Sequence, residues 1–124
     1  VAAATLVERP NSELHALARK LGVPTVVVTL GAEGCFVSHE DADDRRGDAK
    51  PYYRIPAEKV EAVDSTGAGD AFSGALAAAM LRFADRPFRD AVVHANRAAA
   101  MSTEIVGTAP AMAHFEAVIS RFGA

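Results

Sequence analysis

The stretch Asp64-Ser65-Thr66-Gly67-Ala68-Gly69-Asp70 stands directly ahead of an apolar run, 71–76. The small residues Gly67, Ala68 and Gly69 let backbone N–H groups approach an anion closely. The apolar run predicts a helix, whose first N–H groups lack intrahelical partners and whose dipole places about half a positive charge at that end. The stretch therefore predicts a phosphate-binding turn at the start of a helix, within an alternating α/β chain.

Asp70 falls in the first turn of this predicted helix. A buried carboxylate beside a transferring phosphoryl group is a natural general base, and such a base contributes about 10²–10⁴ in rate. The N–H groups of Gly67, Ala68 and Gly69 would form an anion hole for the charge on that group. The pattern favours a kinase in which Asp70 accepts the proton of an attacking hydroxyl.

Two better-known phosphate-binding loops do not fit this stretch. A P-loop requires a Gly followed by Lys and Ser or Thr, and no glycine here precedes a lysine in that context. The dinucleotide fingerprint requires a third glycine where this chain has Phe72. The remaining alternative is an ordinary glycine-rich turn that opens a buried helix, with Asp64 or Ser65 as its cap.

Residues 64–76 resemble the second signature of the ribokinase or PfkB-type carbohydrate kinases, which reads Asp-Thr/Ser-x-Gly-Ala-Gly-Asp followed by Phe and a Gly-Ala pair. Residues 26–34 are similar to the strand and turn that border the adenosine of ATP in that family. Residues 94–101, with Gly107-Thr108-Ala109-Pro110, are similar to its adenine-side helix and to the loop that closes a monovalent-cation site. The three matches occur in the family's order.

The resemblance implies a role for each matching residue. Asp70 would be the catalytic base, and Gly67, Ala68 and Gly69 would bind the γ-phosphate. The nucleotide would be lined by Thr29, Gly31, Gly34 and Asn96. The potassium ligands would be Asp64, the Thr66 backbone, and backbone carbonyls of Thr103, Val106 and Gly107. Ala111 stands where ribokinases often carry Ser, so one hydroxyl ligand of that site is missing.

The resemblance also implies a ribokinase-like three-layer α/β/α sandwich, of which residues 1–124 would be the C-terminal ATP-binding part. The family's sugar-binding residues, lid strands and magnesium-linked Asn-x-x-Glu motif do not appear in this chain. The chain begins at Val1 and not at Met, so we expect a piece of a longer protein that is inactive alone. Family members commonly dimerise through the lid strands, so the full-length protein is expected as a possible homodimer.

The expected function is transfer of the γ-phosphate of ATP to a sugar hydroxyl, with Mg²⁺ and K⁺ as ions. Ribose is the first expected substrate because the Asn96 to Pro110 segment is most similar to the ribokinase branch. Fructose, 2-keto-3-deoxygluconate, sugar phosphates and nucleosides stay open. Two alternatives also stay open: a nucleotide-binding fragment without catalytic activity, and a structural or regulatory α/β domain.

Composition argues against several other classes. The 124 residues carry a formal net charge of −3, with 23% charged and 50% hydrophobic residues, so a nucleic-acid partner is not expected. The longest apolar stretch, Ala71 to Leu81, is too short for a bilayer, which needs about 20 residues. The single cysteine, Cys35, favours a reducing cytoplasm and is expected inside a strand.

Periodicity outlines the elements. We expect a helix capped by Asn11 or Ser12 and stopped at Gly22, and a strand from Thr25 to Leu30 that is covered on both faces. A hairpin would join that strand to 35–38, and an exposed charged loop from His39 to Lys50 would precede a strand at Tyr52–Ile55. Further helices are expected after Gly69, after Pro87 to about Met101, and after Pro110.

Overall fold

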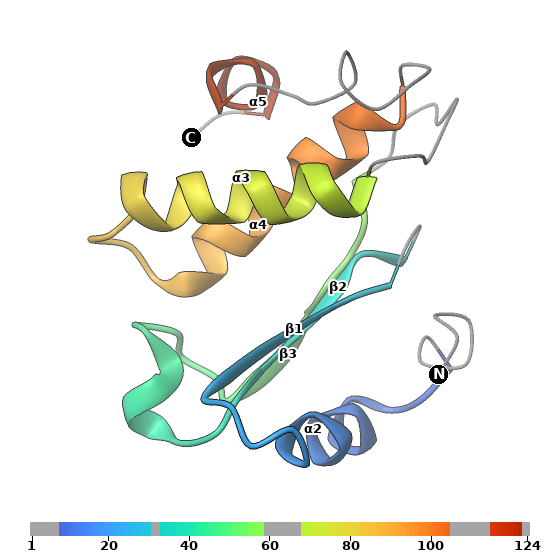
Figure 1. The fold of residues 1–124 in the computed structure, drawn as a ribbon, viewed down its shortest axis with the longest axis vertical. Coiled ribbons are helices and arrows are strands. Elements are labelled where there is room, and N and C mark those ends of the chain that lie inside the picture. The colour runs from blue at the N-terminus through green and yellow to red at the C-terminus, as the bar shows by residue number, and fades with distance from the viewer. Residues whose placement is uncertain (1–7, 31–32, 59–67, 105–114, 123–124) are drawn as a thin grey trace. The chain divides into compact units, whose positions relative to one another are not determined.

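The computed structural model describes residues 8–30, 33–58, 68–104 and 115–122. The chain divides into two compact units, residues 1–57 and 58–124. Among the described residues, the first unit holds a small sheet, a nine-residue α-helix and a short 3-10 helix, and the second holds three α-helices (Figure 1). Both helices and strands are present, as the sequence predicts, but every described strand lies in the first unit.

Three strands form the sheet of the first unit, β1 (Thr25–Thr29), β2 (Cys35–His39) and β3 (Tyr52–Ile55). They pair antiparallel in the order β1-β2-β3, with Val37 of β2 opposite both Val27 and Tyr53. The predicted hairpin between the first two strands and the predicted third strand are confirmed.

Burial differs between these strands. All five residues of β2 are buried, whereas β1 is half-buried and ends in an exposed Thr29. The expectation that β1 is covered on both faces is wrong for the described part of the chain. The reason is position: β2 has a strand on each side, and β1 is at the edge of the three described strands.

Helix α2 (Asn11–Arg19) packs against β2 and β3. Its buried Leu14 joins Leu30 and Phe36 in an apolar cluster. The predicted cap is wrong, since Pro10 is the N-cap and no side chain caps the helix. Asn11 is the first helical residue, and its Oδ1 accepts a hydrogen bond from Nε of Arg54 at 2.9 Å.

The charged segment from His39 to Lys50 is exposed at most of its described residues, as its composition predicts, but it is not exposed throughout. It contains a short 3-10 helix, η2 (Ala42–Arg45). Two of its polar side chains are buried, those of His39 and Asp48. The composition did not indicate these two buried groups, which satisfy each other as described below.

The second unit contains α3 (Ala68–Arg82), α4 (Phe88–Ser102) and α5 (Phe115–Phe122). Helices α3 and α4 form an extensively packed pair, and α5 packs on both (Figure 1). The buried faces carry many small side chains, including Ala79, Ala91 and Ala95, which allow close helix packing. All three helices appear within a few residues of their predicted positions. No helix among the described residues is long and apolar enough to cross a membrane.

Candidate functional site

The first turn of α3 consists of Ala68, Gly69 and Asp70. A Cβ built on Gly69 would meet no described atom within 4 Å, so space is open beside this turn. Because the first N–H groups of a helix have no intrahelical acceptor, this turn offers donors and a positive dipole end to an anion. A phosphoryl group fits that geometry. Gly67 lies outside the described residues.

Asp70 is exposed on this turn. The expectation of a buried carboxylate is therefore wrong for this structure. Exposure leaves the carboxylate accessible to a hydroxyl substrate, as a general base requires.

The end of α4 lies at the same end of the helix pair as the start of α3, because the two helices run antiparallel (Figure 1). Thr103 caps α4, and its Oγ1 donates to the Ala100 carbonyl at 2.6 Å. The Thr103 carbonyl follows the last helical residue and is one of the groups that a helix leaves without an intrahelical donor. It is a suitable cation ligand. The other predicted ligands lie outside the described residues: Asp64, Thr66, Val106 and Gly107.

Asn96 lies inside the helical unit, on α4, and its side chain is buried. A buried amide requires hydrogen-bond partners. The adenine-side position that the resemblance implies for Asn96 stays a prediction.

The turn between β1 and β2 contains the other predicted nucleotide residues. The Leu30 N–H donates to the Gly34 carbonyl at 2.8 Å, and Thr29 pairs with Cys35, so Thr29 and Gly34 lie at the same end of the hairpin. Gly31 lies outside the described residues. The structure thus brings the predicted residues together as two groups, one in each unit.

Gly34 has a reason to be glycine that involves no ligand. Its φ is +94°, and a Cβ there would lie 1.9 Å from the carbonyl oxygen of Ile55. The sheet itself excludes any side chain at this position. A glycine in the nucleotide-side motif is therefore also a requirement of the hairpin.

A buried polar network in the first unit was missed by the sequence analysis. His39 Nε2 lies 2.8 Å from Oδ2 of Asp48, and the Tyr53 hydroxyl donates to the same oxygen at 2.5 Å. His39 Nδ1 lies 2.9 Å from the Thr25 hydroxyl. The network joins all three strands to the segment after η2. Alternation along β3 indicated that Tyr53 faces opposite to Tyr52, but nothing in the sequence paired Asp48 with His39.

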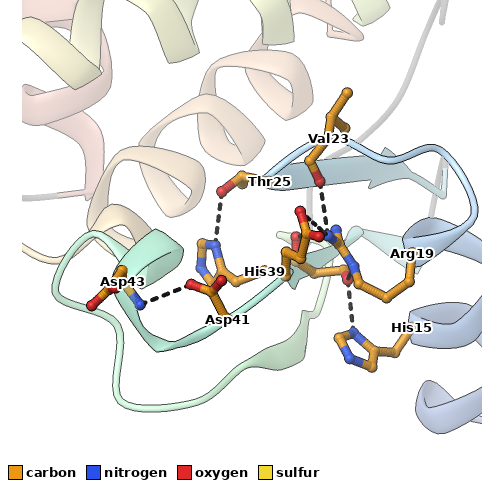
Figure 2. Close-up of polar contacts among 9 residues, drawn as sticks. His15, Arg19, Val23, Thr25, His39, Asp41 and Asp43 are labelled. Atoms are coloured by element: carbon orange, nitrogen blue, oxygen red, sulfur yellow. Dashed lines mark hydrogen bonds and ion pairs between the residues drawn. The ribbon is translucent and has the colours of Figure 1, made fainter.

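A second polar cluster connects α2 to the sheet (Figure 2). His15 Nδ1 lies 2.7 Å from Oγ of Ser38, and Arg19 donates from Nε to the same oxygen at 3.1 Å. The His15 ring also stacks on Tyr52, with centroids 4.4 Å apart. Burial and the neighbouring Arg19 cation lower the pKa of His15. The cluster explains the position of α2 on the strands.

Cys35 is fully buried, as its place in a predicted strand suggested. Burial raises the pKa of its thiol to about 12. The thiolate is the reactive form, so this cysteine is a packing residue.

The comparisons with known proteins agree with this arrangement. Residues 3–114 match the family model described as pfkB family carbohydrate kinase. The ribokinase of Mus musculus is 39% identical over 88 residues, which is 70% of this chain and 25% of that protein. The chain thus spans about a quarter of the length of this relative.

Two solved structures extend the likeness to the fold. The ribokinase of Arabidopsis thaliana, complexed with ribose and ATP, superposes with a TM-score of 0.71 at 27% identity, over 88% of this chain and 32% of that one. The aminoimidazole riboside kinase of Salmonella enterica, complexed with aminoimidazole riboside and an ATP analog, gives 0.70 at 26% identity, over 91% and 36%. The ribokinase-like α/β fold expected from the sequence is confirmed. The chain belongs to the pfkB family of carbohydrate kinases.

Proposed function

We propose that this chain is the C-terminal, nucleotide-binding part of an ATP-dependent sugar kinase. The observation that carries the proposal is the first turn of α3, where the open space at Gly69 lies beside an exposed Asp70. Donors for a phosphoryl group and a carboxylate for a hydroxyl proton thus occupy consecutive positions. That combination is what phosphoryl transfer to an alcohol requires.

In the proposed reaction Asp70 takes the proton of the sugar hydroxyl as its oxygen attacks the γ-phosphate of ATP. The N–H groups of residues 67–69 hold the phosphoryl oxygens, and ADP leaves. Mg²⁺ would come with the nucleotide and neutralise phosphate charge. Among the described residues no group of three or more His, Cys, Asp or Glu side chains forms a metal cluster.

The proposed substrate is ribose or a compound containing a ribose ring. Two of the relatives above are complexed with such compounds, ribose and aminoimidazole riboside. Potassium is proposed at the end of the helix pair, with the Thr103 carbonyl among its ligands. A cytoplasmic location and a possible homodimer of the complete protein belong to the same proposal.

A titration of magnesium ADP into this chain tests the nucleotide site directly. We expect saturable binding that is weaker in sodium than in potassium. Gly69→Val places a branched side chain in the open space of the first turn and should weaken binding at least about tenfold. Ala77→Val is the matched control, because Ala77 is exposed on the same helix and far from its first turn.

Equal ADP affinity for the two valine variants would contradict the phosphate assignment.

The second candidate function is a nucleotide-binding part without catalysis. It predicts the same titration but no sugar-dependent ADP production when the complete protein is assayed.

A further inference from the structure

A cavity of about 200 Å³ lies within the second unit, between the start of α4, the residues just before it and α5. Phe83, Val93 and Ile119 form apolar walls. The polar lining consists of Arg86, Arg89, Asp90, His94 and Arg97. His94 and Arg97 lie in the segment 94–101 that resembles the family's adenine-side helix, but none of the lining residues was assigned a nucleotide or ion contact above.

The lining carries more positive than negative side chains, although the chain as a whole is acidic. Three arginines and one aspartate line it, whereas the whole chain has a net charge of −3. The stretch 82–97 contains four arginines and no lysine. Arginine presents a planar fork of donors that matches phosphate oxygens in pairs, which the point charge of lysine does not.

The arginines differ in their partners. Arg97 donates from Nε to Glu58 at 3.0 Å, which fixes its guanidinium. The Arg86 guanidinium lies over the Phe83 ring, 4.4 Å from its centroid. No carboxylate among the described residues pairs with Arg86, so its charge is not neutralised within the part of the chain that the structure describes.

The arginines near the cavity also act on His94. Its ring is buried and meets the Phe83 ring edge to face, with centroids 5.8 Å apart. Burial, Arg97 and Arg82 all lower the pKa of His94. A neutral imidazole at pH 7 keeps one N–H donor and adds no charge to the cavity.

We propose that this cavity binds a small tetrahedral oxyanion, either inorganic phosphate or the phosphoryl group of a phosphomonoester. Size selects the class, because pockets for larger organic ligands occupy about 300–1,000 Å³ and this cavity is smaller. The first turn of α4, which supplies Arg89 and Asp90, adds the positive end of a helix dipole.

This site is separate from the phosphate-binding turn of the kinase. Helix α3 has 15 residues and is therefore about 22 Å long. The proposed nucleotide phosphates lie at its first turn, whereas Phe83 and Arg86 follow its last. An anion in the cavity would not contact the transferred phosphoryl group.

Phosphate titration of the chain, followed through the ring resonances of His94 by NMR, tests the proposal at the site itself. The His94→Gln variant assigns the signals. We expect a saturable shift of these resonances with inorganic phosphate. A parallel titration with methyl phosphate distinguishes the two sources: tighter binding of inorganic phosphate indicates the free ion, and tighter binding of methyl phosphate indicates a phosphomonoester.

Three variants sharpen the test. Arg86→Gln with Arg89→Gln should weaken phosphate binding at least about tenfold. Lys20→Gln with Lys50→Gln makes the same change in net charge on exposed residues of the other unit and should leave binding unchanged. Asp90→Asn removes the one carboxylate of the lining and should tighten binding at least about threefold.

The gain expected for Asp90→Asn cannot arise from misfolding. His94 resonances that do not move with phosphate would overturn the proposal. The proposal would also be overturned if the double arginine variant bound phosphate as tightly as the double lysine control.

Discussion

Oδ2 of Asp48 receives two contacts inside the first unit, from His39 Nε2 at 2.8 Å and from the Tyr53 hydroxyl at 2.5 Å. Both carboxylate and imidazole are withdrawn from solvent, with side-chain exposures of 1% and 0%. A buried carboxylate is stable only when its oxygens are satisfied. This oxygen therefore anchors the segment after η2 to β2 and β3.

We predict that Asp48→Asn lowers the free energy of unfolding of the first unit by about 2 kcal/mol, since hydrogen bonds to a charged group contribute about 1.5–3 kcal/mol. Tyrosine fluorescence in a urea titration reports this unit alone, because both tyrosines lie in β3 and the chain has no tryptophan. Asp43→Asn is the exposed control and should change stability by at most about 0.5 kcal/mol. Equal effects of the two variants would remove the network from its anchoring role.

Gly34 provides a second stability test. Gly34→Ala should cost at least about 2 kcal/mol, because the new Cβ would combine a φ of +94° with a clash against the Ile55 carbonyl. Gly22→Ala shares the left-handed backbone, with φ +71°, but meets no atom within 4 Å and should cost about 1 kcal/mol. The same urea titration measures both. A smaller loss for Gly34→Ala than for Gly22→Ala would contradict the fold of the hairpin.

His15 predicts a pH dependence of the same unit. Burial, followed by the Arg19 cation, lowers the pKa of His15 below 6.5, so the unfolded chain binds this proton more tightly than the folded one. Its contribution to stability is complete above pH 6.5 and is lost as pH falls through the folded pKa. We expect His15→Gln to flatten the stability profile below pH 6.5 in tyrosine-monitored unfolding. An unchanged slope in that variant would exclude His15 as the source.

Cys35 predicts slow thiol chemistry. With its pKa raised to about 12 by burial, the native thiol is protonated at pH 8 and shielded from reagent. We expect an aromatic disulfide reagent to react at least about a hundredfold faster with the urea-unfolded chain than with the native chain. The single cysteine makes the assay unambiguous. Comparable rates would show that β2 is not buried as described.

The helices and strands were largely predictable because their signals are local. The apolar spacing of Val118, Ile119 and Phe122 gave α5, and Pro87 marked the start of α4. Long-range pairing was not predictable in the same way. The sequence of 39–50 reads as a solvated loop, since only the fold brings Asp48 to His39 and Tyr53.

The candidate site was predictable as a motif and less so as an environment. The sequence placed Ala68, Gly69 and Asp70 at a helix start, which the structure bears out. It did not predict that Asp70 is exposed. It also did not predict that the Ile55 carbonyl leaves no room for a side chain at Gly34. Both properties depend on neighbours that are distant along the chain. The arginine-lined cavity was missed for another reason: Arg86, Arg89 and Asp90 lie outside the motifs of the family resemblance, and no role was assigned to His94 or Arg97 within residues 94–101.

The most direct test of the proposed kinase function is the turnover of Asp70→Asn in the complete protein, measured as ribose-dependent ADP production from magnesium ATP. Asp85→Asn, an exposed carboxylate beyond the far end of α3, is the matched control. We predict that Asp70→Asn cuts turnover at least about a hundredfold while ADP affinity stays within about twofold, because only proton acceptance is lost. Turnover equal to that of the Asp85→Asn control would show that Asp70 is not the general base.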